Sequence, residues 1–141
     1  MKLCSACLLG IECRYDGKSN PNGNIIKLSK KETLIPVCPE QLGGLSTPRK
    51  LAGIYLKNYV RTVGDGEDVT KYFCKGAEEV LKLVKLYDIK EVILKQGSPS
   101  CGSGRTWQLD KEFLNHKVKG YGITARLLKK NGIKVISEEM F

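Results

Sequence analysis

The segment from residue 68 to residue 95 constrains the fold more than any other part of the chain. Apolar residues recur at helical spacing after Asp68, whose carboxylate can accept the free backbone N–H groups of a first helical turn. The short, mostly apolar run EVILK follows at residues 91–95 and is typical of a buried strand. One long amphipathic helix leading into a strand indicates a parallel α/β arrangement with crossover connections. The apolar face of this helix would consist of Val69, Phe73, Ala77, Val80 and Val84.

Other short runs along the chain repeat this alternation of strand and helix. Residues 54–63 predict a hairpin, which we expect at the edge of the main sheet. The fold class predicted is α/β: one compact domain over residues 1–141, with a Rossmann-like, mostly parallel sheet flanked by helices and a small β-hairpin excursion. The remaining predicted strands are 2–6, 33–38 and 133–137, and the remaining predicted helices are 24–31 and 121–132.

Charge and composition leave several classes of partner to consider. The 24 lysines and arginines exceed the 15 acidic residues, which gives a net charge of +9 and permits anionic partners such as RNA. No nucleic-acid-binding motif accompanies that charge, and lysines alternate with apolar residues in residues 81–90 as they do on solvated helix faces. We therefore favour a solvated surface over a nucleic-acid footprint.

The six cysteines bear on the cellular compartment as well as on chemistry. No apolar run approaches the about 18 residues that a membrane span needs, and the first residues do not resemble a secretory signal. We expect a cytoplasmic protein, in which thiols stay reduced. Its cysteines are then metal ligands, nucleophiles or core thiols rather than disulfides.

Three cysteines occupy equivalent places relative to the predicted strands. Cys7 follows the first strand, Cys38 ends the second, and Cys101 lies in the glycine- and serine-rich loop after residues 91–95. Because the carboxyl ends of parallel strands meet at one edge of a sheet, we expect these residues to converge there. We also expect Cys101 to be exposed, since a flexible loop offers little to cover it.

The other candidate ligands give weaker signals. Cys74 lies inside the long helix and is expected as a core thiol. Cys4 forms a C-x-x-C pair with Cys7, but a single such pair is weak evidence for a metal or redox site. Cys13 is ambiguous, and we favour a structural role. His116, the one histidine, lies in a polar segment and is expected on the surface.

Three thiolates without histidine are too few for a closed structural zinc site, which takes four protein ligands. They suit an iron–sulfur cluster, whose irons are held by thiolates. In a [4Fe–4S] cluster, three protein ligands would leave one iron open to a soft substrate atom such as sulfur.

Several motifs occur in combination along the chain: CLLG at 7–10, RYDG at 14–17, PVCPE at 36–40, GGL at 43–45, TPR at 47–49, DVT at 68–70, SPSCG at 98–102 and the final segment 122–139. Together they resemble a bacterial family associated with 2-thiouracil desulfuration, and the likeness covers nearly the whole chain.

The resemblance implies a [4Fe–4S] enzyme that removes sulfur from a thiolated pyrimidine without net redox change and yields uracil and hydrosulfide. It implies that Cys7, Cys38 and Cys101 hold the cluster. Carried onto this chain, the family's acidic catalytic residue is Glu40 and its catalytic serine is Ser98. The expected partner is a small thiolated base.

Substrate contacts follow from the residues beside these motifs. Ser100 is two residues from Ser98 and is the alternative functional serine. Arg14 and Arg49 are expected to bind an anionic group of the substrate, with a structural ion pair as the equal alternative for each. We expect Ser100, Arg14 and Arg49 to form the substrate-binding set.

Three other functions compete with desulfuration. A cluster-dependent sulfur transferase of nucleoside or tRNA thiolation would need ATP, yet no G-x-x-x-x-G-K-[ST] loop is present. A metal-stabilised basic module would bind RNA without catalysis. A thiol redox protein would use Cys4 and Cys7 and would work without metal.

Overall fold

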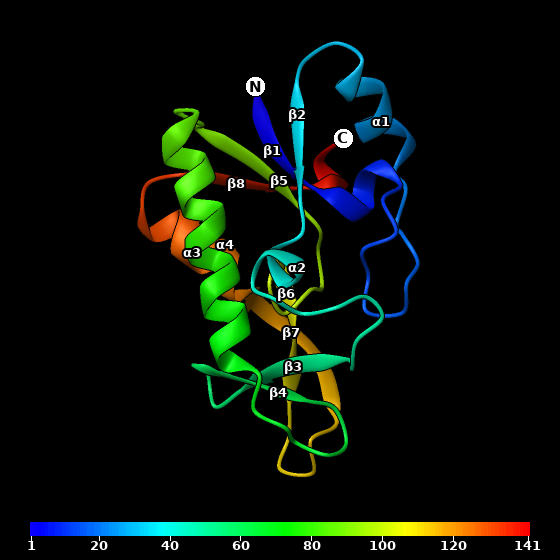
Figure 1. The fold of residues 1–141 in the computed structure, drawn as a ribbon, viewed down its shortest axis with the longest axis vertical. Helices are drawn as coiled ribbons and strands as arrows, with labels where there is room; N and C mark the ends of the chain where they lie inside the picture. Colours follow the sequence, from blue (N-terminus) through cyan, green and yellow to red (C-terminus); the bar gives the residue numbers. More distant parts are fainter.

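Four short parallel strands present alternate side chains to opposite sides of one sheet. The structure is a computed structural model that describes residues 1–141 and contains two four-stranded sheets (Figure 1). The first, called the parallel sheet below, has the order β2-β1-β5-β8 with every pair parallel. Its strands are β1 (Lys2–Ser5), β2 (Leu34–Val37), β5 (Glu91–Leu94) and β8 (Lys134–Ser137).

Helices cover both faces of the parallel sheet. Leu3 and Val92 face α3 (Thr70–Leu86) and α4 (Ile123–Lys130), while Cys4 and Ile93 face α1 (Gly23–Ser29) and the 3₁₀ turn η1 (Ala6–Leu9). Figure 1 shows α3 and α4 on one side of this sheet and α1 on the other. Each fully buried Leu, Ile or Val contributes about 1.5–3 kcal/mol relative to exposure. The predicted α/β fold, with a mostly parallel sheet flanked by helices, is confirmed.

Helix α3 has the apolar face that its sequence predicts, with Phe73, Ala77, Val80 and Val84 buried. The N-cap of α3 is Val69, whose side chain makes no cap hydrogen bond, so the prediction of Asp68 as the N-cap is wrong by one residue. Asp68 Oδ1 instead accepts a hydrogen bond from the Thr70 backbone N–H at 2.9 Å, just before the helix. The expectation for Cys74 is wrong, because this side chain is exposed. One residue is a rotation of about 100° along a helix, so Cys74 lies beside the buried face and not within it.

The second sheet has the order β4-β3-β6-β7. The predicted hairpin exists, but β3 pairs with β6 through Ile54 and Gln108, so it is half of this second sheet and not an extension of the first. The hairpin of β6 and β7 was not predicted, because polar residues and glycines in both strands are typical of loops. The four strands of this second sheet are β3 (Ala52–Tyr55), β4 (Tyr59–Thr62), β6 (Ser103–Leu109) and β7 (Asn115–Tyr121).

The short helix α2 (Pro39–Leu42) connects β2 to the second sheet and rests on α3 backbone to backbone. A Cβ atom added at Gly76 would lie 1.9 Å from the Pro39 carbonyl oxygen, and one added at Gly43 would lie 1.9 Å from the Tyr72 carbonyl oxygen. Only glycine permits this approach, and it holds α2 between the two sheets (Figure 1).

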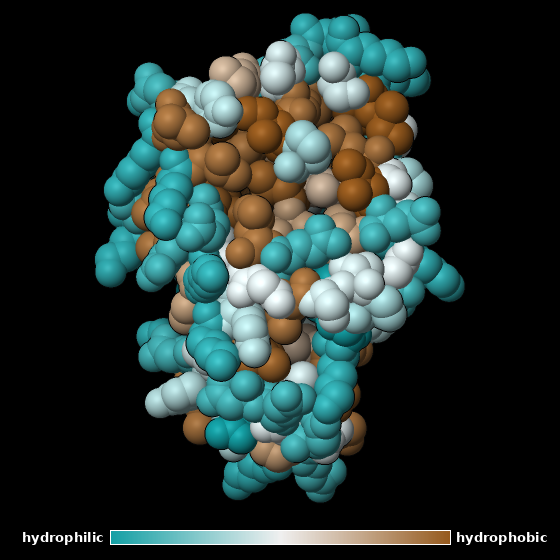
Figure 2. Space-filling model, in the orientation of Figure 1, coloured by the Kyte–Doolittle hydropathy of each residue, from teal (hydrophilic) through white to brown (hydrophobic).

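Hydrophobic and hydrophilic atoms are unevenly distributed on the face shown in Figure 2. Hydrophobic atoms gather over the upper part of the molecule, where the parallel sheet lies, and hydrophilic atoms cover most of the lower part, where the second sheet lies. No helix is both long enough and apolar enough to span a bilayer.

Candidate functional site

A cavity of about 240 Å³ lies where the carboxyl ends of β1, β2 and β5 face the second sheet. Residues from both sheets line it, including Trp107 of β6 and Lys117 of β7. All eight residues singled out from the sequence line this one cavity, whereas Cys4, Cys74 and His116 do not. The eight are Cys7, Cys38, Cys101, Glu40, Ser98, Ser100, Arg14 and Arg49.

The loop that carries Cys101 is held by the beginning of α4. The backbone N–H groups of Ile123 and Thr124 donate to the carbonyl oxygens of Pro99 and Ser100 at 2.9 and 3.0 Å. These are helix N-terminal donors with no partner inside the helix, so the loop takes the place of a side-chain cap. The loop is thereby rigidly placed, in contrast to the flexibility expected from its composition.

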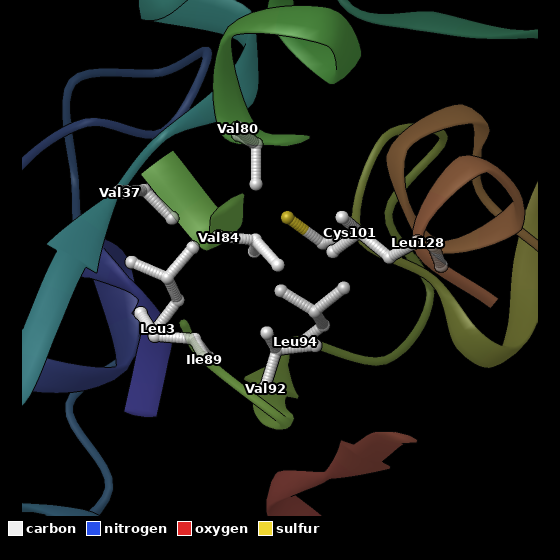
Figure 3. Packing of buried hydrophobic residues seen from close by; sticks show 10 residues of the cluster. Leu3, Val37, Val80, Val84, Ile89, Val92, Leu94, Cys101 and Leu128 are labelled. Atoms are coloured by element: carbon white, nitrogen blue, oxygen red, sulfur yellow. The ribbon is translucent and has the colours of Figure 1, made fainter. Parts of the chain in front are cut away.

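Cys101 is not exposed as predicted. It is 5% exposed and belongs to a core cluster with Leu3, Val80 and Val84, and Figure 3 shows its sulfur directed toward the two valines. Burial, followed by the nearby Cys7 and Cys38, raises the pKa of its thiol. Cys101 therefore belongs both to the core and to the cavity wall, because α4 covers the loop that its own sequence leaves polar.

Cys13 is the thiol whose place the sequence leaves ambiguous, and it lies between two of the predicted ligands. Hydrogen bonds to Cys38 and Cys7, together with burial, raise the pKa of Cys13, so it stays protonated. Hydrogen bonding from Cys13 lowers the pKa of Cys7, and it lowers the pKa of Cys38 to about 6 against the effect of burial. Four thiols thus line one cavity, and the pKa values of two of them, Cys7 and Cys38, are lowered. No three metal-binding side chains are placed to hold a single ion.

Glu40 lies in the first turn of α2, two residues after Cys38, and both carboxylate oxygens are engaged. Oε1 accepts from Arg49 Nε at 3.0 Å, and Oε2 accepts from Ser100 Oγ at 2.8 Å. The side chain is 14% exposed and that of Arg49 is 6% exposed. A carboxylate held on both oxygens at a cavity wall has one orientation, which suits it to act on a bound molecule.

Ser98 and Ser100 form a hydrogen-bonded chain that leads to this carboxylate. The Ser98 hydroxyl oxygen accepts from the backbone N–H groups of Ser100 and Cys101 at 3.1 and 3.0 Å, and it lies 3.0 Å from Ser100 Oγ. Since the Ser100 hydroxyl donates to Glu40, the Ser98 hydroxyl donates to Ser100. Ser98 is half-buried and reaches the cavity, whereas Ser100 is fully buried behind it.

The two arginines differ in their surroundings. Arg14 is paired with Asp16 at 2.9 Å and Asn20 at 2.7 Å, with its side chain 31% exposed at the cavity. Arg49 is almost fully covered, and its guanidinium contacts Glu40, Ser46, Thr47, Cys13 and Cys38. Both arginines therefore form ion pairs inside the protein, Arg14 with Asp16 and Arg49 with Glu40.

One pair at the cavity has no signal in the sequence. Lys95 Nζ lies 2.8 Å from the Glu138 carboxylate, whose other oxygen accepts from the Gln96 backbone N–H at 2.8 Å. Glu138 is 8% exposed, and it ties the last turn of the chain to the segment that leads to Cys101. A glutamate 43 residues after a lysine in sequence is not recognisable as its partner without the fold.

These features define an α/β protein in which cysteine sulfurs, a fixed carboxylate and serine hydroxyls share one cavity. The model of the 2-thiouracil desulfurase family matches residues 3–140. The chain therefore belongs to the 2-thiouracil desulfurase family, as its motifs indicate.

Two further comparisons agree with this membership. The chain is 43% identical to the uncharacterized protein YbbK of Bacillus subtilis (strain 168) in an alignment of 146 positions that covers 98% of this chain and 95% of that protein. Its structure is similar to that of a [4Fe–4S]-dependent thiouracil desulfidase, TudS, with a TM-score of 0.89 and 40% sequence identity over 99% of this chain and 91% of the other. Both likenesses extend over essentially the whole chain, so they cover both sheets and the cavity between them.

Proposed function

We propose that this protein is a [4Fe–4S]-dependent enzyme that converts a thiolated pyrimidine such as 2-thiouracil to uracil and hydrosulfide without net redox change. The observation that carries the proposal is one cavity lined by Cys7, Cys38 and Cys101 together with the doubly held carboxylate of Glu40. Membership of the 2-thiouracil desulfurase family and the likeness to the thiouracil desulfidase TudS support an iron–sulfur desulfurase over the alternatives.

The donor set fits an iron–sulfur cluster. Cys7, Cys38 and Cys101 would hold it, since they come from three separate strand ends and line one cavity with no histidine among its lining residues. Hydrogen bonding from Cys13 favours the thiolate forms of Cys7 and Cys38, and thiolates are the forms that bind iron. When bound, the cluster would supply a Lewis-acidic iron with affinity for the sulfur of the substrate.

Glu40 would act as the general acid–base. Its carboxylate would take a proton from a water molecule as the water oxygen bonds to the C=S carbon of the ring. The same carboxyl group would return the proton as the carbon–sulfur bond breaks. The ring gains a carbonyl oxygen, sulfur leaves as hydrosulfide, the second proton of the water is released to solvent, and no electrons are gained or lost overall.

Ser98 is the second proposed catalytic residue. Its hydroxyl lines the cavity and would turn its proton from Ser100 Oγ to the ring or the attacking water, since both of its lone pairs already accept backbone N–H groups. Ser100 in turn donates to Glu40. Arg14, partly exposed at the cavity, would contact the substrate. A buried Ser100 would contribute to substrate binding through Glu40 and Ser98 rather than by direct contact.

The other candidate functions find less support. Burial raises the pKa of Cys4 to about 12, which disfavours the reactive thiolate that a C-x-x-C redox pair requires. The small cavity between the sheets fits a free base better than a long nucleic acid. We place the enzyme in the cytoplasm, where the reducing environment keeps such thiols available for iron.

The test is anaerobic reconstitution with iron and sulfide, followed by turnover of 2-thiouracil in ¹⁸O-labelled water without a reductant. About four irons and four sulfides per chain are expected, with one ¹⁸O atom in each uracil and one hydrosulfide released. Glu40→Gln should keep its iron while turnover falls by roughly 10²–10⁴-fold, because the amide cannot accept the proton. A colourless protein that binds one zinc and no sulfide would overturn the proposal.

A further inference from the structure

We infer that Arg49 is the positioning residue of this site: its guanidinium holds the Glu40 carboxylate in a fixed place beside the sulfur of Cys38 and does not bind the substrate. This inference rests on the proposed function, since it assigns Arg49 to the same reaction. It replaces the expectation that Arg49 contacts an anionic group of the substrate.

The hydrogen bonds of the guanidinium account for every donor it has. A guanidinium carries five N–H groups and no acceptor. Nε donates to Glu40 Oε1 at 3.0 Å, and Nη1 donates to the Ser46 carbonyl oxygen at 3.3 Å and to Thr47 Oγ1 at 2.9 Å. Nη2 donates to the Cys13 carbonyl oxygen at 2.9 Å and contacts Cys38 Sγ at 3.8 Å. No donor remains for a substrate.

Three parts of the site meet at this one side chain. The loop of Cys13 lies against Cys7 and Cys38, the first turn of α2 carries Glu40, and Cys38 itself precedes that turn. The planar guanidinium fixes the directions of all these contacts at once. The backbone of α2 sets the separation of Cys38 and Glu40, and Arg49 fixes the orientation of the Glu40 carboxylate beside Cys38 Sγ.

The charge of Arg49 is already balanced inside the protein. Its side chain is 6% exposed and forms an ion pair with a carboxylate that is itself only 14% exposed. To bind a substrate anion, the guanidinium would have to abandon Glu40 and leave a largely covered carboxylate without its partner, which is costly. Arg14 at the same cavity is 31% exposed and pairs with Asp16, which is 25% exposed, so water can solvate both charges of that pair.

The test compares Arg49→Gln and Arg49→Lys with Lys50→Gln, which removes the same charge from the adjacent, exposed residue. Each reconstituted protein is assayed on 2-thiouracil and on a thiolated uridine monophosphate, which adds an anionic group. We expect kcat of Arg49→Gln to fall by roughly 10²-fold on both substrates, with little change in KM, because small misplacements of a catalytic group cost about that much. Arg49→Lys should recover only part of this loss, since a point charge cannot replace the planar fork. Lys50→Gln should match the wild type.

A second measurement does not depend on turnover. Hydrogen bonds and positive charge at a ligating sulfur stabilise the reduced cluster. The reduction potential of Arg49→Gln should therefore be more negative than those of the wild type and Lys50→Gln, at equal iron content.

A rise in KM confined to the phosphorylated substrate, with kcat unchanged, would overturn the inference and make Arg49 an anion-binding residue. An unchanged potential with unchanged kcat would overturn it as well. If Arg49→Gln fails to fold, the Arg49→Lys variant provides the test. Full iron content with a lowered kcat on both substrates supports the positioning role of Arg49. A normal kcat per cluster refutes that role. A wild-type protein that holds four irons and desulfurates neither substrate would instead refute the proposed function. The reduction potentials of the wild type and Arg49→Gln would still report whether Arg49 contacts the cluster ligand Cys38.

Discussion

The two ends of the parallel sheet carry the same kind of ion pair in different surroundings. At the amino end of the strands, Lys2 Nζ lies 2.5 Å from Glu32, with the two side chains 22% and 28% exposed. At the carboxyl end, Arg49 lies 3.0 Å from Glu40, with side chains 6% and 14% exposed. The Lys2–Glu32 pair is partly exposed to solvent, whereas Arg49 and Glu40 are each held by further hydrogen bonds.

The difference arises from what covers each end. The loops beyond the carboxyl ends of β1, β2 and β5 meet the second sheet, which encloses the cavity with Trp107 and Lys117. Nothing comparable covers the amino ends, where Lys2, Glu32 and Glu91 interact as partly exposed charges. A Lys–Glu pair at the amino end is therefore partly exposed, whereas the Arg–Glu pair at the carboxyl end is covered and held in one orientation by further hydrogen bonds.

The cysteine substitutions test this contrast most strongly. Cys7→Ser, Cys38→Ser or Cys101→Ser should abolish cluster binding, because an alcohol is a poor replacement for thiolate on iron. Cys74→Ser is the matched control and should keep full iron, since its side chain is exposed on α3. Iron and acid-labile sulfide per chain, measured after anaerobic reconstitution, decide this. Retention of iron in Cys101→Ser would exclude that residue as a ligand.

Gly76→Ala should push the backbone of α2 away from α3 and so disturb the site at the carboxyl end of the parallel sheet. Replacing glycine by alanine within a helix ordinarily gains about 1 kcal/mol. Here the new methyl group would lie 1.9 Å from the Pro39 carbonyl oxygen, so we expect a net loss of about 1–3 kcal/mol in the free energy of unfolding. Denaturant unfolding gives the value, and Lys75→Ala on the exposed side of α3 serves as control. A more stable Gly76→Ala would show that α2 and α3 can separate without cost.

Ser98→Ala and Ser100→Ala should separate loop stability from orientation of the carboxylate. Ser98→Ala leaves two backbone N–H groups without their acceptor, so it should lower the melting temperature as well as turnover. Ser100→Ala removes a hydrogen bond to the Glu40 carboxylate, and turnover should fall by roughly tenfold, the equivalent of about 1.4 kcal/mol. Equal melting temperatures and equal turnover in the two variants would contradict this division.

Glu32→Gln, at the amino end, should have the smallest effect. A hydrogen bond from Lys2 lowers the pKa of Glu32, so its stabilising contribution is present above the unfolded-state pKa and is lost as pH falls through the folded-state value. At pH 7 we expect a loss of about 0.2–1 kcal/mol in unfolding free energy, which disappears in acid, with turnover unchanged. Denaturant unfolding at pH 7 and at pH 3 measures both. A loss of turnover would show that the two ends of the sheet are coupled.

The sequence by itself determined the parallel α/β arrangement and that Cys7, Cys38 and Cys101 meet at one edge of the sheet. The apolar period of residues 69–84 and the run at 91–95 predict a helix and a strand, and strand ends in a parallel sheet meet at one edge. Cys7, Cys38 and Cys101 could be located in this way because each follows a strand. Glu40 lies at the same edge because it follows Cys38 by two residues.

Only the tertiary structure decided which of those groups are covered and what each one contacts. The burial of Cys101 depends on α4, and the enclosure of the cavity depends on the hairpin of β6 and β7, whose polar strands resemble loops in sequence. Ser100 reaches Glu40 across 60 residues and Arg49 reaches the Cys13 carbonyl across 36. Local spacing specifies where a strand or helix ends, but burial and pairing depend on residues that only folding brings together, and these turn Arg49 from an expected substrate contact into a side chain with no free donor.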